Sequence, residues 1–246
     1  MREVCQNWLS VTTNPGLWQV LKRLGIRYKQ ARAYLRSPDP DYIAKLQEVQ
    51  KIIQRSAKDP QNIVVIFLDE LTFYRQPSLA KAYECSGKVQ PLAKLGHRSN
   101  LSSRILAGIE IWQGKVLYLQ RSKISLATLR KFYEQLANSF PNAEVIYVVQ
   151  DNWPVHFHPD VLAILMEQDF KWPLHTPRNW PDKARKNIQA LNLPIKFVFL
   201  PTYAPWTNPI EKLWRKLKQE VLHLHRYEDD WDGLKGRVDH YLSEFA

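Results

Sequence analysis

Three acidic residues, far apart in the chain, each accompany an apolar run that is typical of a β-strand. Asp69 and Asp151 lie at the ends of two such runs, and Glu211 lies in the first turn of a predicted basic helix that follows a third run. The strand ends of an open α/β sheet gather side chains at one crevice, so the three carboxylates are expected to converge. Mg²⁺ prefers hard oxygen ligands. Two such ions about 4 Å apart can activate an attacking water or 3′-hydroxyl and stabilise the leaving oxygen, so the pattern predicts phosphodiester chemistry.

Each of these residues also has a purely structural interpretation. Asp69 is compatible with a solvated turn after a strand, and Asp151 with the first residue of a turn. Glu211 lies three residues after Asn208 and fits the back-bonding member of a helix capping box. Glu70 neighbours Asp69, and since adjacent strand residues point to opposite faces, only one of the two is expected to face the site. The joint occurrence of all three acids after apolar runs favours the metal site.

Several polar residues near the three acids are candidates for supporting the carboxylates or contacting DNA. His156 and His158 follow Asp151 closely, and with it they are compatible with a transition-metal site. The favoured roles are a DNA or carboxylate contact for His156 and a helix cap for His158. The basic side chains on the predicted helix after residue 208 fit either a solvated face or a phosphate track. The full set of supporting or DNA-contacting candidates is Glu70, Asn152, His156, Asn208, Lys212, Arg215 and Lys216.

The composition favours a polyanionic partner. The chain has 246 residues, 45% of them hydrophobic, and a net charge of +11, which suggests nucleic acid before membrane. Residues 1–36 carry seven Lys and Arg against one acid, and residues 171–226 carry eleven against three. Residues 227–246 are acidic, with six acids and two basic residues. The two basic blocks are expected to bind a phosphate backbone.

Cysteine usage and hydropathy narrow the class of protein further. Cys5 and Cys85 do not form a CxxC pair, which argues against a zinc site and a disulfide framework. No apolar stretch reaches 18 residues, and the start does not fit a signal peptide. The expected location is the cytoplasm, without a membrane partner.

The N-terminal region is expected to form a short helix followed by a basic strand. In the helix over 15–24, Asn14 fits the N-cap, Pro15 the first helical position and Gly25 the stop. Together with the basic strand-like residues 26–36, this helix resembles the end of a winged helix-turn-helix. A packing arm on the main domain is the alternative.

The rest of the chain predicts an α/β layered sheet. An irregular insertion is expected at 170–194, with one short helix near 183–191. The predicted parts are a partial DNA-binding segment at 1–38, a linker helix at 39–60, a catalytic domain at 61–226 and an acidic helix or tail at 227–246. The predicted strands are 63–68, 104–111, 115–120, 145–149 and 195–200, and the predicted helices are 41–56, 125–138, 158–168 and 208–225.

Hydrophobic periodicity also predicts which residues of three helices face the core. The predicted inward residues are Ile43, Leu46, Val49 and Ile53 in the first helix, Leu129, Phe132, Tyr133 and Leu136 in the second, and Ile210, Leu213, Trp214, Leu217 and Val221 in the last.

Three motifs resemble those of a known family. Leu68-Asp-Glu70, Gln150-Asp-Asn-Trp-Pro-Val-His156 and the stretch from Leu200 to Trp214, with Thr-Asn-Pro-Ile-Glu at its centre, resemble the catalytic motifs of mariner-like bacterial insertion-sequence transposases with a DDE endonuclease domain. The resemblance spans about residues 62–222.

The resemblance implies a fold, a site and an activity. The fold would be an RNase H-like mixed sheet flanked by helices, with Asp69, Asp151 and Glu211 as the metal-binding triad for two Mg²⁺ ions, for which Mn²⁺ can substitute. The activity would be cleavage of double-stranded DNA at transposon ends and transfer of the 3′-hydroxyl into target DNA. Cutting two ends suggests a homodimer on DNA, associated with the bacterial nucleoid.

Two departures from the family keep other functions open. The 59 residues between Asp151 and Glu211 exceed the usual spacing, and the N-terminal region is short, as expected for a fragment of a longer reading frame or a remnant that no longer transposes. The alternatives are a catalytically silent DNA-binding protein and a nuclease of the same fold that only hydrolyses. A glycosidase, suggested by paired acids and many tryptophans, fits the charge of +11 poorly.

Overall fold

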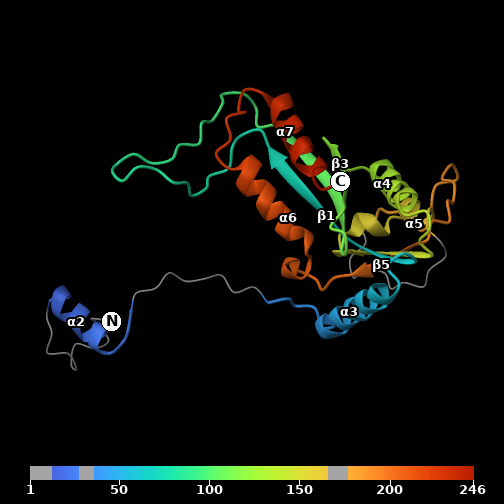
Figure 1. The fold of residues 1–246 in the computed structure, drawn as a ribbon, viewed down its shortest axis with the longest axis horizontal. Coiled ribbons are helices and arrows are strands. Elements are labelled where there is room, and N and C mark those ends of the chain that lie inside the picture. The colour runs from blue at the N-terminus through green and yellow to red at the C-terminus, as the bar shows by residue number, and fades with distance from the viewer. Residues whose placement is uncertain (1–12, 28–35, 166–176) are drawn as a thin grey trace. The chain divides into compact units, whose positions relative to one another are not determined.

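Five strands form one mixed sheet in the order β3-β2-β1-β4-β5 (Figure 1). This computed structural model describes residues 13–27, 36–165 and 177–246. β1 pairs antiparallel with β2 and β2 with β3, whereas β4 and β5 run parallel to β1. The α/β class predicted from the sequence is confirmed. The strands are β1 (Ile63–Tyr74), β2 (Ser102–Glu110), β3 (Val116–Arg121), β4 (Val145–Gln150) and β5 (Ile195–Phe199).

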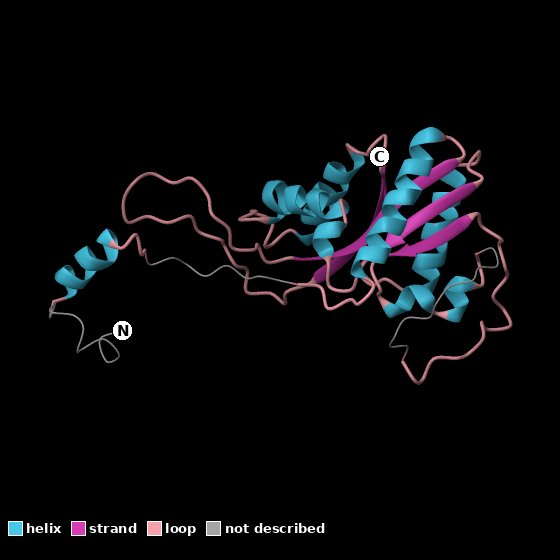
Figure 2. Cartoon of the chain, turned by 90° about the horizontal axis from the view of Figure 1, so that it is seen from below, coloured by secondary structure: helices cyan, strands magenta, loops and turns pink. Residues whose placement is uncertain are grey.

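Helices cover both faces of the sheet (Figure 2). One face packs against α4 (Leu126–Ser139) and α5 (Pro159–Leu162) through the even-numbered apolar residues of β1. The other face packs through the odd-numbered residues against α3 (Tyr42–Lys58), α6 (Ile210–Leu217) and α7 (Trp231–Ser243). Because both faces of β1 are covered, its first half is apolar without alternation, as expected for a central strand.

The predicted inward faces of two helices are confirmed. In α4 the buried residues are Leu129, Phe132, Tyr133 and Leu136, and Ser125 Oγ accepts a hydrogen bond from the backbone N–H of Thr128 as the N-cap. In the last predicted helix all five inward residues are buried, and α6 passes at its C-terminal end into the π-helical turn η3 (Lys218–Leu222). A period of 3.6 residues therefore located the core-facing side chains correctly.

The predicted face of α3 is wrong at its N-terminal end. Val49 and Ile52 are buried against the sheet, whereas Ile43 is 62% exposed. Only the C-terminal half of the helix packs on the sheet, where Ser56 Oγ donates a hydrogen bond to the carbonyl of Ile63 at 2.6 Å. Hydrophobic periodicity predicts an inward face along the whole helix, but how much of that face is buried depends on how far the sheet extends beneath it.

β1 is longer than predicted, and this changes the environment of two candidate site residues. The predicted strand ended at Leu68, but β1 continues to Tyr74, so Asp69 and Glu70 lie inside the strand. β4 pairs with β1 only as far as Phe67, whereas β2 pairs with it through Tyr74. The second half of β1, which contains Asp69 and Glu70, is therefore held by β2 alone, because the pairing with β4 has already ended.

Two predicted helices between β4 and β5 differ from the structure. Within the predicted helix at 158–168, only the short α5 (Pro159–Leu162) is helical, and it follows a 3-10 turn, η1 (Pro154–Phe157); residues 166–168 lie outside the described part. The helix near 183–191 is absent, since residues 177–194 form turns and bends. Leu165 makes an isolated parallel bridge with Leu193, at the end of this segment. Residues 170–176 of the predicted insertion lie outside the described part.

Residues 13–27 contain the helix α2 (Asn14–Arg23), in a compact unit separate from residues 37–246. The predicted helix is confirmed, but its N-cap is Thr13, not Asn14, because Thr13 Oγ1 accepts a hydrogen bond from the backbone N–H of Gly16 at 3.3 Å. Gly25 follows the helix with φ +71°, a conformation that favours glycine. The predicted basic strand at 26–36 falls mostly on residues outside the described part.

The acidic C-terminal segment contains a packed helix. In α7, Leu234, Val238, Tyr241 and Leu242 are buried against α6 and the sheet. Asp230 caps the helix by accepting a hydrogen bond from the backbone N–H of Gly233 at 2.8 Å. None of the described helices has the length and apolar character needed to cross a bilayer.

The burial of α7 predicts a large stability difference between two substitutions on the same helix. Leu234→Ala removes a fully buried side chain and is expected to lower the free energy of unfolding by about 2–5 kcal/mol. Arg237→Ala changes an exposed position and is expected to stay within about 0.5 kcal/mol. Urea unfolding of residues 1–246 measures both. Equal effects would contradict the packing of α7 into the core.

Candidate metal-binding and catalytic site

Asp69 lies in the middle of β1 and points toward α6. Its Oδ2 accepts a hydrogen bond from Trp214 Nε1 of α6 at 2.9 Å. Burial, followed by the charges of Glu70 and, to a smaller extent, Glu211, raises the pKa of the Asp69 carboxyl to about 7, against the opposing effect of the Trp214 hydrogen bond. The pKa of Asp69 therefore lies near neutral pH, and a nearby positive charge would favour the ionised carboxylate.

Asn208 ties the start of α6 to β1. Its Nδ2 donates a hydrogen bond to the carbonyl of Leu68 at 3.1 Å, and its Oδ1 accepts one from the backbone N–H of Ile210 at 3.3 Å. The amide thus caps the helix and joins it to the residue just before Asp69. Glu211, in the first turn of α6, is brought close enough for its charge to raise the Asp69 pKa.

Asp151 directly follows β4, the strand beside β1. The last pair in the parallel ladder is Phe67 with Val149, so Asp69 and Asp151 each stand two residues further along neighbouring strands. Paired positions on parallel strands lie about 4.8 Å apart and share a face. Asp151 is exposed, and its Oδ1 accepts a hydrogen bond from the backbone N–H of Trp153 at 3.0 Å. The register brings the two aspartates to neighbouring strand ends beyond the last ladder pair, but the ligand group that contains Asp151 is completed by Glu70 and His156, not by Asp69.

The loop that carries the third motif is fixed from two sides. Asn152 Nδ2 donates to the carbonyl of Leu200 at 2.8 Å, which joins the end of β4 to the end of β5. Thr202 donates its backbone N–H to Asp39 Oδ2 at 2.8 Å, and Asp39 also pairs with Lys45 at 2.7 Å. These contacts outweigh the effect of burial and lower the pKa of Asp39 to about 2. The segment before and within α3 therefore holds this loop in place.

The group of possible metal-ligand atoms found among the described residues is not the predicted triad, because it contains Asp151 but neither Asp69 nor Glu211. One oxygen of Glu70, one of Asp151 and a ring nitrogen of His156 all lie within 4.8 Å of one another. His156 is fully buried, with Nδ1 2.9 Å from the Tyr133 hydroxyl and Nε2 3.4 Å from Glu70 Oε1. The expected carboxylate contact of His156 is present. The partnership with Glu70 was not foreseen, because it requires β1 to extend past residue 68.

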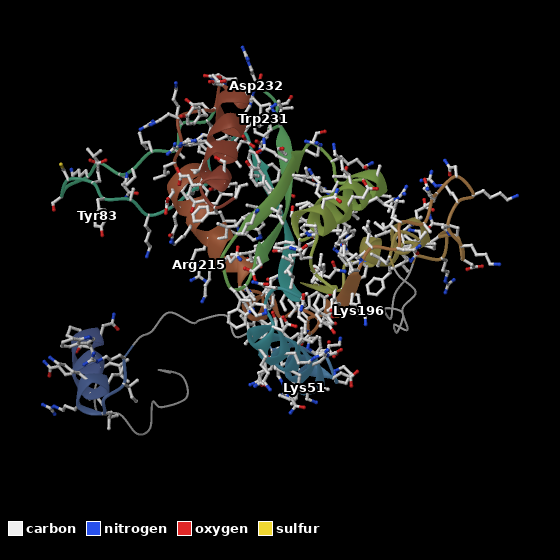
Figure 3. The ribbon with its side chains drawn as sticks, turned by 45° about the vertical axis from the view of Figure 1, so that its right-hand side comes forward. Lys51, Tyr83, Lys196, Arg215, Trp231 and Asp232 are labelled. Carbon is white, nitrogen blue, oxygen red and sulfur yellow. The ribbon has the colours of Figure 1, made fainter. Side chains whose placement is uncertain are left out.

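Among the remaining candidates, the predicted role of one histidine is confirmed, whereas the predicted DNA contact of the basic residues on α6 stays a prediction. His158 caps α5, since its Nδ1 accepts a hydrogen bond from the backbone N–H of Asp160 at 3.1 Å, which confirms its predicted role. Arg215 projects from α6 (Figure 3), and it forms an exposed basic face with Lys212 and Lys216. This exposure suits a solvated face and a phosphate track equally, so the contact with DNA stays a prediction. Tyr133 and Trp214, both predicted as core residues, also hold the site residues.

Comparisons with known proteins agree with this architecture. Residues 64–235 match the family model described as DDE superfamily endonuclease. The chain is 22% identical over 223 residues to an insertion element IS630 uncharacterized 39 kDa protein of Shigella sonnei, covering 90% of this chain and 56% of that protein. The chain thus spans a little over half the length of this relative.

Solved structures of a transposase share the fold. A Mos1 transposase paired-end complex with left transposon end matches with a TM-score of 0.60 and 15% identity, over 98% of this chain and 66% of that chain. A pre-cleavage Mos1 transpososome matches with a TM-score of 0.62 and 13% identity, over the same shares. The mixed sheet flanked by helices is therefore the RNase H-like fold that the resemblance implied.

The family model covers most of the chain, including the sheet and all three motifs. The chain therefore belongs to the DDE superfamily endonucleases.

Proposed function

We propose that this chain carries out Mg²⁺-dependent DNA transposition, with Asp69, Asp151 and Glu211 as the catalytic metal ligands. The observation that carries the proposal is the packing of the start of α6 against β1, which buries Asp69 near Glu211; burial first, and then the charges of Glu70 and Glu211, raise the pKa of Asp69 to about 7. A divalent cation would remove that repulsion. All three side chains offer oxygen ligands, which suits Mg²⁺ and permits Mn²⁺.

Each residue has a distinct part in the proposal. Asp69 and Asp151 would hold both ions and Glu211 would complete one site; the ions would supply activation of the attacking oxygen and stabilisation of the leaving oxygen. Trp214 keeps Asp69 oriented, because its indole N–H donates a hydrogen bond to Oδ2. Asn208 fixes the distance between α6 and β1. The basic face of α6 binds phosphates beside the carboxylates.

The proposed partner is double-stranded DNA, both as transposon ends and as target. The similar Mos1 structures are paired-end and strand-transfer complexes, and paired-end complexes with Mn and with Mg are among them. A pair of ends implies two active sites, so a homodimer on DNA is part of the proposal. DNA of a bacterial insertion element lies in the cytoplasm, at the nucleoid, and this is where we place the activity.

Cleavage of plasmid DNA tests the proposed activity. With Mg²⁺, the wild-type protein is expected to nick supercoiled DNA, and Asp151→Asn to lower the rate at least about 100-fold, because one ligand charge of both metal sites is lost. Asp182→Asn changes an exposed acid in the 177–194 segment and serves as the matched control. Strand-transfer products on a second plasmid separate a transposase from a nuclease that only hydrolyses. Equal nicking by wild type and Asp151→Asn would remove the triad from the mechanism.

The raised pKa of Asp69 predicts an unusual dependence of stability on pH. Between pH 3.8 and about 7 the folded state binds one more proton than the unfolded state, so metal-free stability falls as the pH rises through this window. Asp69→Asn cannot ionise and is expected to be more stable than wild type at pH 8 in EDTA, by roughly 2–4 kcal/mol. At pH 4 the two proteins should unfold alike.

Adding Mg²⁺ tests whether a cation reverses the loss of stability caused by the ionised Asp69. At pH 8 it is expected to raise the thermal midpoint of the wild type, because the ion binds only the folded carboxylates, and to leave Asp69→Asn nearly unchanged. If the free energies of unfolding of wild type and Asp69→Asn in EDTA changed with pH in the same way, the pKa of Asp69 would not be raised in the folded protein.

A further inference from the structure

A buried histidine nitrogen and a carboxylate oxygen face each other beside the catalytic acids without a hydrogen bond between them. His156 Nε2 and Glu70 Oε1 are both buried and 3.4 Å apart, and neither makes a hydrogen bond within the described residues. Burying unpaired polar atoms costs free energy, so a native site of this kind calls for an occupant. We propose that Glu70, Asp151 and His156 bind one transition-metal cation. This site is distinct from the proposed catalytic site of Asp69, Asp151 and Glu211, and Asp151 belongs to both.

The hydrogen bonds of His156 orient its free nitrogen as a ligand. The Tyr133 hydroxyl donates to Gln150 Oε1 at 3.1 Å, so its oxygen is left to accept from His156 Nδ1, 2.9 Å away. This network places the ring proton on Nδ1 and the lone pair of Nε2 toward Glu70. Metal-binding histidines commonly use their second nitrogen in this way, which fixes the tautomer and the ring orientation.

The separations of the ligand atoms fit a single ion. Bonds of about 2.1 Å from a metal to nitrogen and oxygen put neighbouring ligand atoms roughly 3.0–3.4 Å apart. His156 Nε2 and Glu70 Oε1 lie 3.4 Å apart, and the Asp151 oxygen lies within 4.8 Å of both. The exposed carboxylate of Asp151 can close the remaining distance by rotating, and its open side leaves room for water ligands.

The donor set selects the class of ion. One imidazole nitrogen with two carboxylate oxygens suits Mn²⁺, Co²⁺ or Zn²⁺, whereas Mg²⁺ prefers oxygen alone. The two faces of β1 therefore serve different ions: Asp69 faces α6 with oxygen ligands only, and Glu70 faces His156. Because Asp151 is common to both sites, an ion at this site holds its carboxylate in place for the catalytic site.

Binding of Co²⁺ to the metal-free protein, followed by visible absorption and calorimetry, tests the proposal without an activity assay. Wild type is expected to show an imidazole-ligated Co²⁺ spectrum. His156→Asn, whose amide can still reach Tyr133 but has no group at the Nε2 position, and Glu70→Gln are each expected to bind at least about tenfold more weakly. Thermal melts of both variants check the fold. Binding equal to wild type in both folded variants would overturn the proposal and leave a proton between the two groups.

Asp69→Asn separates this inference from the proposed function. This variant loses a catalytic ligand but keeps all three groups of the second site, so its Co²⁺ affinity should stay within about twofold of wild type while Mg²⁺-dependent nicking is lost. Nicking by Asp69→Asn with loss of Co²⁺ in His156→Asn would refute the catalytic triad and support the second site. Loss of Co²⁺ in Asp69→Asn but not in His156→Asn would refute the second site and leave the triad standing.

Discussion

The side-chain amide of Asn208 joins the two elements on which the site depends. It donates to the carbonyl of Leu68 and accepts from the first turn of α6, so one planar group sets the position of a helix against a central strand. Asp69 comes next on the strand, and Glu211 lies in the first turn of the helix. Few other side chains could replace Asn208, because its role needs a hydrogen-bond donor and an acceptor on one short, rigid group.

Charge is distributed unequally between the two sides of β1. Asp69 is held by the Trp214 indole on the α6 side, while Glu70 faces the buried ring of His156 on the α4 side. Consecutive strand residues point to opposite faces, so one pair of adjacent acids supplies two separate environments. The first has only oxygen ligands and a raised pKa at Asp69. The second adds an imidazole nitrogen, which is the physical basis for expecting different ions.

Hydrophobic periodicity predicted which side of the helices faces the core, but not how far along each helix the buried part extends. The inward faces of α4 and α6 followed from a period of 3.6 residues, because each of these helices lies against the sheet along its whole length. α3 packs only through its C-terminal half, which left Ile43 exposed. Between β4 and β5 the composition suggested a helix near 183–191, but residues 177–194 form turns. The backbone N–H of Arg185 donates a hydrogen bond to Asp160, and Leu193 bridges Leu165, so contacts with distant residues outweigh the local helix propensity.

By itself the sequence determined the sheet class, the order of the motifs and the acids available for metal binding, because apolar periodicity and side-chain chemistry are local properties. Only the tertiary structure decided that β1 runs past Leu68 to Tyr74, since its last residues are held by β2 and not by their own propensity. The same extension turned Glu70 toward His156. Which carboxylate faces which neighbour depends on strand register and helix placement, and these arise from contacts between residues far apart in the chain.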